Sequence, residues 1–471
     1  MTQVQDARIQ KLNNAPIRDR TYVLYWMQAS QRAEDNYALE YAVQRANELN
    51  KPLLVAFGLM DDYPDANLRH YLFMLEGLKE VQESLERRKI KMVVQKGAPP
   101  VVAETLGQEA SLVVTDMGYL RLQRQWRKQL AGRLNCQLIQ VEDNVVVPVE
   151  LASNKAEYGA RTLRPKLQKH VDHFLLELRT SAVKHSSLEL EVESLDLKNP
   201  GELCASLKLN REVAGVSNFF SGGTRQAKTS LHQFLEQNFD SYADNRNQPQ
   251  TSDTSYMAMY LHFGQISPIY IALKAKEAKS KGKNIESFLE ELIVRRELAM
   301  NFTHFNDTYD DYSVLPDWAK KTLNEHKKDK RDPHYSLEQL EKAQTHDPYW
   351  NAAMKEMRFT GYMHNYMRMY WGKKLLEWSP DPEEGFKRTL FLNNKYFLDG
   401  RDPNSFTGVA WCYGQHDRAW QERAIFGKIR YMNANGLKAK SKPDEYVKKV
   451  NKLVAKATGE SLTAVEQASL F

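Results

Sequence analysis

The chain has 471 residues, of which 42% are hydrophobic and 27% are charged, and its formal net charge is +6. This composition is typical of globular proteins, and the length makes two domains the expected number. We find no apolar run of membrane-spanning length and no signal-peptide pattern, so we expect a cytoplasmic protein. The three cysteines are scattered, which argues against a disulfide framework and a cysteine-rich zinc site, and we expect no metal. The basic excess permits an acidic partner such as nucleic acid.

The first half of the chain predicts an α/β domain with a parallel sheet. Residues 1–20 are polar, and we expect a flexible N-terminus. From 21 to 180, apolar strand-like runs alternate with helical patterns, which is typical of a parallel sheet covered on both faces. The strand-like runs lie at 21–27, 52–60, 91–97, 111–117 and 136–148. No GxGxxG or GxxxxGK[ST] motif follows a strand, so an ordinary dinucleotide or P-loop site is not indicated.

The second half predicts an all-helical domain. The pattern changes near residue 215, so we expect an interdomain linker over 181–220, a helical domain over 221–455 and a polar tail over 456–471. The predicted helices lie at 226–237, 256–263, 268–279, 285–305, 337–343, 348–357, 362–378, 382–392 and from 419 onward.

Tryptophan is concentrated between Thr345 and Trp420, where five of the eight tryptophans lie. Indole rings are among the few side chains that can pass single electrons, so Trp350, Trp371 and Trp378 could form an electron path. Large rings that fill a helical core are the simpler interpretation of this pattern, and by pattern alone it is several times more common.

Arg368 and the sequence LDGRDPN (398–404) form a second candidate group. A helical core does not hold a guanidinium without a partner, so Arg368 predicts a buried ion pair with Asp399 or Asp402. Such a pair beside a ring nitrogen would stabilise an anionic flavin. The alternative is that DG and DPN form an ordinary turn.

Charged residues suggest two further sites. On the predicted helix 285–305, Glu290, Glu291 and Glu297 accompany two arginines; a solvated, salt-paired face is the simplest interpretation. One carboxyl turned into a cavity would instead be protonated and could donate a hydrogen bond. From 411 to 449, basic residues are interleaved with aromatic ones, which fits neutralisation of a nucleic-acid backbone together with base stacking.

Several long strings of the chain resemble the class II cyclobutane pyrimidine dimer DNA photolyases, over nearly its whole length. They include YWMQASQRAEDNYAL (25–39), YLHFGQIS (260–267), EELIVRREL (290–298), THDPYWNA (345–352), YMRMYWGKKLLEW (366–378) and FGKIRYM (426–432). The resemblance implies a monomeric, light-driven lyase that repairs cyclobutane pyrimidine dimers in UV-damaged DNA. It implies FAD, active as FADH⁻, in the helical domain and an antenna chromophore of the deazaflavin or folate type in a Rossmann-like α/β domain.

The resemblance also implies roles for individual residues. FAD would be held by Tyr242, Thr254, Ser255, Ala258, Arg368, Asp399 and Asn393, the last facing flavin N5. Trp371 and Trp350 would donate electrons, with Trp378 and Tyr335 as neighbouring options, and Glu291 would hydrogen-bond the dimer. The lesion would be contacted by Arg246, Asn247, Met369, Trp411, Trp420 and Arg430, and the last of these would fill the hole left by the flipped dimer.

Two stretches depart from the family pattern. Tyr256, Ala258 and Met259 stand where the family usually has Arg, Ser and Pro, which removes a hydroxyl that would contact the FAD phosphates. The loop 411–420 is one residue shorter than its usual form.

Two other functions are compatible with parts of the pattern. One is a cryptochrome-like flavoprotein photoreceptor without repair activity, and the predicted lesion pocket argues against it. The other is an electron-transfer flavoprotein unconnected to DNA, which leaves the basic and aromatic residues of 411–449 unexplained.

The chain ends in QASLF (467–471). Gln467, Leu470 and Phe471 resemble the short peptides that dock bacterial sliding clamps by burying two apolar anchors in a groove. A frayed tail with chance apolar residues is the alternative.

Overall fold

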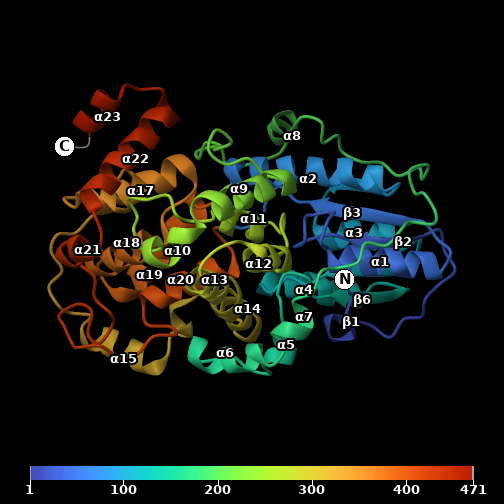
Figure 1. Ribbon diagram of the computed structural model, residues 1–471, viewed down its shortest axis with the longest axis horizontal. Coiled ribbons are helices and arrows are strands. Elements are labelled where there is room, and N and C mark those ends of the chain that lie inside the picture. Colours follow the sequence, from blue (N-terminus) through green and yellow to red (C-terminus); the bar gives the residue numbers. More distant parts are fainter. Residues whose placement is uncertain (1, 469–471) are drawn as a thin grey trace.

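The computed structural model describes residues 2–468, which form an α/β domain followed by a helical domain (Figure 1). The α/β domain is built on one sheet with the strand order β1-β6-β5-β2-β3-β4. The strands are Ile9–Lys11 (β1), Tyr22–Trp26 (β2), Leu53–Leu59 (β3), Lys91–Lys96 (β4), Ala110–Asp116 (β5) and Gln137–Val141 (β6). Strands β2 to β6 pair in parallel, as predicted, whereas β1 is antiparallel to β6, so the sheet is mixed.

We predicted a flexible N-terminus over residues 1–20, but this segment contributes a strand to the sheet. Its strand β1 extends the sheet, and the buried guanidinium of Arg8 donates hydrogen bonds to the carbonyl oxygens of Glu142, Val145 and Val146 at 3.0, 3.1 and 2.7 Å. The segment is polar, so its sequence did not predict an ordered structure. Its polar groups are instead hydrogen-bonded within the fold.

Alternate side chains of the sheet enter two separate cores. Val23 and Tyr25 of β2 face the helices Tyr37–Glu48 (α1) and Leu68–Arg87 (α2). Leu24 and Trp26 face Pro99–Gly107 (α3) and Arg121–Ala131 (α4). The period of two along a strand produces this division, and it places helices on both faces. The remaining helices before the second domain are Val149–Ala152 (α5), Ala160–Gln168 (α6), Val171–Phe174 (α7) and Pro200–Ser206 (α8).

The predicted linker, 181–220, packs along the edge strand β4. The Val94 amide donates to Ser194 Oγ at 2.9 Å, and the Leu195 amide donates to the Val94 carbonyl at 2.7 Å. The segment therefore covers backbone groups that an open sheet edge would expose.

The second domain is helical, as predicted. Its helices are Thr224–Gln237 (α9), Tyr242–Asn245 (α10), Ala258–His262 (α11), Pro268–Glu277 (α12), Gly282–Leu289 (α13), Arg296–Phe305 (α14), Asp317–Glu325 (α15), Leu337–Glu341 (α16), Pro348–Thr360 (α17), Asn365–Trp378 (α18), Pro382–Tyr396 (α19), Pro403–Cys412 (α20), Ala434–Lys440 (α21), Pro443–Thr458 (α22) and Leu462–Ala468 (α23). A π-helical segment, Glu290–Arg295 (η3), interrupts the single helix predicted over 285–305. Three short 3₁₀ turns are Asp6–Arg8 (η1), Phe239–Ser241 (η2) and Tyr312–Val314 (η4). Within residues 2–468, no helix has the length and apolar character needed to cross a membrane.

The prediction of a helix from residue 419 onward is wrong over 419–433. The stretch 413–433 forms no helix, and the helices resume only at Ala434. His416, Ile425, Gly414 and Gly427 in this stretch have positive φ angles of 60°, 69°, 109° and 52°. A right-handed helix cannot pass through such residues.

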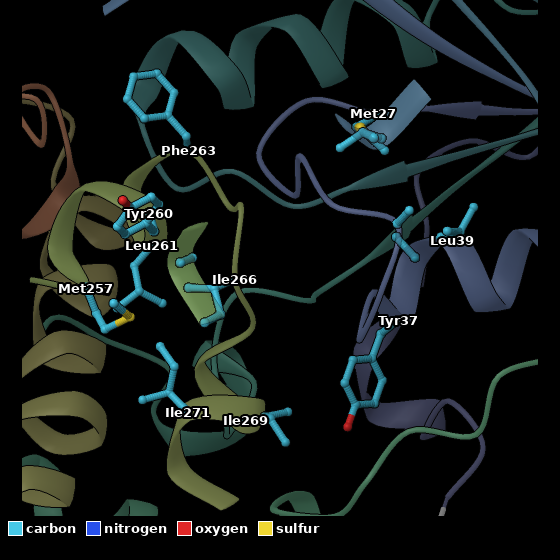
Figure 2. Packing of buried hydrophobic residues seen from close by; sticks show 14 of the residues in the cluster. Met27, Tyr37, Leu39, Met257, Tyr260, Leu261, Phe263, Ile266, Ile269 and Ile271 are labelled. Atoms are coloured by element: carbon cyan, nitrogen blue, oxygen red, sulfur yellow. The ribbon is translucent and has the colours of Figure 1, made fainter. Parts of the chain in front are cut away.

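The two domains share one hydrophobic core. It joins Met27 and Tyr37 of the α/β domain to Met257, Tyr260 and Phe263 of the helical domain, and Figure 2 shows these groups of side chains. A continuous core of this kind fixes the domains against one another, so their facing surfaces can build sites that neither domain builds alone.

Gly264 allows the two domains to meet backbone to backbone. Its φ is +66°, and a Cβ atom there would lie 1.9 Å from the Ala29 carbonyl oxygen. We expect Gly264→Ala to lower the free energy of unfolding by about 3 kcal/mol, from overpacking and from the left-handed backbone. Gly282→Ala is the matched control, since no atom lies within 4 Å of its Cβ position. Equal free energies of unfolding for the two variants in urea titrations would refute this account.

Glu297 of α14 is buried at the domain interface and accepts hydrogen bonds from the amides of Val146 and Val147 at 2.6 and 3.3 Å. Burial raises the pKa of Glu297 from its ordinary 4.5 to about 8. The folded chain therefore holds a proton here that the unfolded chain releases above 4.5. This contribution to stability is full below pH 4.5 and declines as pH rises to about 8.

We expect Glu297→Gln to flatten the fall in the free energy of unfolding over this pH interval, because glutamine releases no proton. The wild-type slope from this group is about 1.4 kcal/mol per pH unit. Glu286→Gln, on the exposed side of α13, should leave the slope as it is. An unchanged slope in Glu297→Gln would remove Glu297 as its source.

Candidate active site

Arg368 and Asp399 form a largely buried, two-pronged ion pair between α18 and the turn after α19, with side chains 21% and 8% exposed. Arg368 Nη1 and Nη2 lie 2.8 and 3.0 Å from the two carboxylate oxygens of Asp399. The guanidinium also lies 4.0 Å from the ring centroid of Phe397. Burial acts to lower the pKa of Arg368, but the charge and hydrogen bonds of Asp399 outweigh it and raise that pKa above its usual value. The pair is therefore a fixed positive and negative charge that is largely shielded from water.

Of the two partners predicted for Arg368, the structure selects Asp399. Asp402 instead caps α20, where its Oδ1 accepts the Asn404 amide at 2.8 Å. Its other oxygen lies 3.2 Å from His262 Nδ1. The DPN sequence thus begins a helix that the turn interpretation did not anticipate.

Asn393 of α19 lies close to this turn and is buried. Its amide nitrogen donates to Ser405 Oγ at 2.6 Å and to Asn394 Oδ1 at 3.0 Å. These two bonds fix the orientation of the side chain.

The predicted tryptophans lie in an ordered chain of contacts. Trp350 Nε1 donates to the Trp371 carbonyl oxygen at 3.1 Å, and the Trp350 and Trp378 ring centroids are 5.5 Å apart. All three are buried. At one end, the Trp371 ring contacts that of Phe397, with 6.2 Å between centroids, and Phe397 lies under Arg368.

The other end of this chain approaches the surface. The Trp378 ring lies 5.3 Å from Tyr335, which is half-buried, and Tyr335 hydrogen-bonds the exposed His346. The contacts therefore run from the buried ion pair to solvent. The sequence predicted Tyr335 as an option but not His346, which belongs to the same aromatic group.

Three of the other residues predicted to bind FAD, Thr254, Ser255 and Ala258, lie just before α11 or at its first position. Thr254 Oγ1 lies 3.3 Å from the hydroxyl of Tyr362, and the Tyr362 ring lies 5.9 Å from the Arg368 guanidinium. Ser255 is half-buried, and Ala258 is exposed at the start of α11. Tyr242, at the start of α10, is buried among phenylalanines, and burial raises the pKa of its hydroxyl to about 12.

Glu291 and Arg246, predicted to contact the lesion, are in direct contact. Arg246 Nη2 lies 2.6 Å from Glu291 Oε1, and its Nη1 donates to Ser287 Oγ at 2.9 Å. Glu291 lies in η3, and its side chain is 31% exposed, so it remains accessible to a ligand. Asn247, the next residue after Arg246, is exposed.

Met369 and Trp411 lie on facing helices, α18 and α20. Met369 Sδ is 4.0 Å from the sulfur of Cys412, and the Arg295 guanidinium is 5.5 Å from the Trp411 ring. Sequence reasoning missed Lys373, which is fully buried and donates to the Cys412 carbonyl at the end of α20. Burial lowers the pKa of Lys373 to about 8.

Trp420 and Arg430 form a further group on the irregular stretch 413–433. Trp420 is 40% exposed, and the guanidiniums of Arg418 and Arg430 lie 5.0 and 5.3 Å from its ring. An exposed aromatic ring with two cations suits contact with a stacked, anionic ligand.

A pocket lies between the two domains, and we call it the interdomain pocket. Sequence reasoning placed no residues in it. The reversal of strand order between β2 and β5 is where ligands of such sheets usually bind, and this rule indicates the place. The pocket is lined on one side by residues after β2 and β3 and on the other by the helical domain, including Gln28, Tyr63, His70, Trp126, His262, Phe263 and Arg401.

Comparison with known proteins identifies the family. A family model described as DNA photolyase matches residues 23–184. A deoxyribodipyrimidine photo-lyase from Methanothermobacter thermautotrophicus is 49% identical over 454 residues, which cover 95% of this chain and 98% of that protein. The chain therefore belongs to the DNA photolyase family, and its enzyme class is that of the deoxyribodipyrimidine photo-lyases.

Two solved structures share the fold at lower identity. A bacterial class III photolyase from Agrobacterium tumefaciens has a TM-score of 0.70 at 18% identity, covering 93% of this chain and 88% of that one. An archaeal photolyase from Sulfolobus tokodaii, described with two FAD molecules and a novel light-harvesting cofactor, has a TM-score of 0.68 at 16% identity, covering 91% and 89%.

Proposed function

We propose that this chain is a class II cyclobutane pyrimidine dimer photolyase that binds FAD in its helical domain and repairs UV-damaged DNA. The observation that carries the proposal is the buried Arg368–Asp399 pair at the inner end of the Trp371–Trp350–Trp378 chain. An aromatic core alone would not require a fixed guanidinium at the end of a path to solvent.

The residues present fit a flavin. The indole nitrogen of Trp371 is buried and has no hydrogen-bond partner among the described residues. Arg368, Asp399 and Asn393 offer a cation, an acceptor and an amide to the polar edge of a ring system. The reduced flavin, when bound, supplies the electron that splits the dimer under light.

The tryptophans perform a second task in this proposal. Trp371, Trp350 and Trp378 carry electrons inward from the Tyr335–His346 surface to keep the site reduced. Their burial holds the rings in place and excludes water, so the contacts of 5.5 and 5.3 Å between neighbouring rings of this path persist.

Glu291 and Arg246 receive the flipped dimer. Flipping is needed because the reacting bases cannot be reached inside the helix stack. Arg246 pairs with Glu291 in the chain without DNA. With the dimer bound, Glu291 acts as a carboxylic acid and donates a hydrogen bond to the dimer where negative charge develops. Met369, Trp411, Trp420 and Asn247 line the pocket, while Arg430 occupies the space that the flipped dimer leaves in the duplex.

The altered segment around Tyr256 is compatible with this arrangement. The Tyr256 ring packs on Tyr362 and Phe220, with centroids 4.9 and 5.6 Å away. Aromatic packing thus anchors the segment that carries Thr254, in place of the family's arginine. For the interdomain pocket we propose an antenna chromophore of the deazaflavin or folate type, since that pocket offers aromatic rings and buried polar groups.

The proposal can be separated from a photoreceptor without repair by a binding experiment. We expect the flavin-loaded chain to bind an oligonucleotide with one thymine dimer at least about tenfold more tightly than the undamaged one, a difference of about 1.4 kcal/mol. Glu291→Ala should weaken binding of the dimer only. Equal affinity for both oligonucleotides would favour the photoreceptor.

We also propose that QASLF docks a bacterial sliding clamp, a proposal that rests on sequence alone. Leu470 and Phe471 lie outside the described residues, and of Gln467 only its place in α23 is described. The full chain should retain the clamp in pull-down experiments, and a chain ending at Glu466 should not. Equal retention by both chains would contradict clamp docking.

A further inference from the structure

A second polar pocket lies away from the candidate active site, on the face of α4 that covers the sheet edge. Its volume is about 440 Å³, within the range of small-molecule sites. Its walls come from β1, β6, α4, α5 and α14. No residue of the proposed flavin, lesion or antenna sites lines it.

Three cations of one helix face line this pocket. Arg124, Arg127 and Lys128 are spaced three and four residues apart on α4, so their side chains point in one direction. The apolar face of α4, with Trp126 and Leu130, packs in the core of the sheet, so the three cations lie on another face of the helix. A helix ordinarily carries charge on such a face, so these cations are informative because they line a pocket.

The charge of these residues is only partly balanced. Arg127 is 7% exposed, and the one hydrogen bond that its guanidinium makes within residues 2–468 goes to the Gly118 carbonyl oxygen, at 2.6 Å. Lys128 is exposed and has no ion-pair partner among residues 2–468. Arg124 alone has a carboxylate, Asp307, at 2.5 Å.

Two buried nitrogen atoms of the pocket residues lack partners within the described chain. They are Arg124 Nε and His304 Nδ1. The other ring nitrogen of His304 lies 3.1 Å from Glu150, which stands at the same pocket. Arg127 and Lys128 therefore remain the two cations of the pocket without a carboxylate ion-pair partner among the described residues, and a phosphate would complement this charge.

The walls also limit the kind of anion. Leu12, Met117 and Ala131 add an apolar surface, and Gln10 and Gln140 add amides. A bare inorganic ion would leave most of the volume unfilled. We propose that this pocket binds a small organic phosphate, with the phosphate on Arg127 and Lys128 and the organic part on the apolar wall.

The test uses the flavin-loaded full chain and adenosine 5′-monophosphate as the probe, with adenosine as the uncharged control. We expect calorimetry to detect binding of the monophosphate and to find adenosine at least about tenfold weaker, since adenosine lacks the charged group that the cations would bind. Lys128→Gln should weaken monophosphate binding by about tenfold on the same basis and fold normally, because Lys128 is exposed.

Arg133→Gln is the matched control, since Arg133 follows α4 but pairs with Glu104 at 3.0 Å outside the pocket. The proposal is overturned if the monophosphate does not bind at millimolar concentration, or if both substitutions have the same effect. It is also overturned if Lys128→Gln weakens binding of undamaged DNA as much as that of the monophosphate, because the pocket would then contact the DNA backbone.

Discussion

Replacing Trp371 by phenylalanine should stop light-driven reduction of the bound flavin while leaving repair by chemically reduced protein intact. Trp371 is the tryptophan that connects the path to the Arg368–Asp399 site, through Phe397, and Trp350 bonds its carbonyl. Phenylalanine keeps most of the buried surface but is a far poorer one-electron donor. We expect the rate of photoreduction to fall by at least about tenfold, equivalent to about 1.4 kcal/mol in barrier height.

The matched control is Trp318→Phe. The Trp318 indole nitrogen is also buried without a hydrogen-bond partner among the described residues, but its ring packs in a different cluster. This control should photoreduce at the wild-type rate. If Trp371→Phe lost both photoreduction and repair while fold and flavin content were unchanged, the donor role would be incorrect.

Breaking the Arg368–Asp399 pair from one side should be the most damaging single change to the helical domain. Arg368→Gln leaves the Asp399 carboxylate buried without its countercharge, which costs about 3–5 kcal/mol of unfolding free energy. We expect the variant to lose FAD on purification for the same reason. The measurements are urea unfolding and the ratio of flavin to protein by absorbance.

Adding Asp399→Asn should recover part of the stability, because the double variant buries no unpaired charge. A coupling free energy of about 0.5–3 kcal/mol is expected from this cycle. Lys387→Gln is the surface control: its pair with Glu383 is half-exposed or more on both sides and should matter by about 1 kcal/mol or less. If Arg368→Gln were no more destabilising than this control, the pair would not be the organising feature of the site.

Much of the fold was predictable because burial leaves strong patterns. Each of the strands β2 to β6 contains buried apolar residues and begins within one residue of its predicted start, although β6 ends at Val141 and not at residue 148. Strand β1 is only IQK, which carries no such pattern; it is specified by pairing with β6 and by Arg8. Helix α20 was not predicted, because the DPN sequence that begins at Asp402 fits a turn and a helix start equally well.

The candidate site was predictable in part. Arg368 required a partner, but only the geometry distinguishes Asp399 from Asp402, since both lie in the same turn sequence. The order of the tryptophans follows from helix packing between α17 and α18, which spacing along one helix does not determine. The cationic pocket joins residues from five elements, so no local pattern indicates it.

The most direct test of the central claim follows one thymine dimer in an oligonucleotide that is mixed with purified, reduced, flavin-loaded protein. The absorbance of intact thymine is recorded under blue light and in the dark. The account predicts recovery under light and none in the dark. No recovery under light, with flavin bound and reduced, would contradict it and would make the Tyr256–Met259 segment and the shortened 411–420 loop marks of a non-repairing relative.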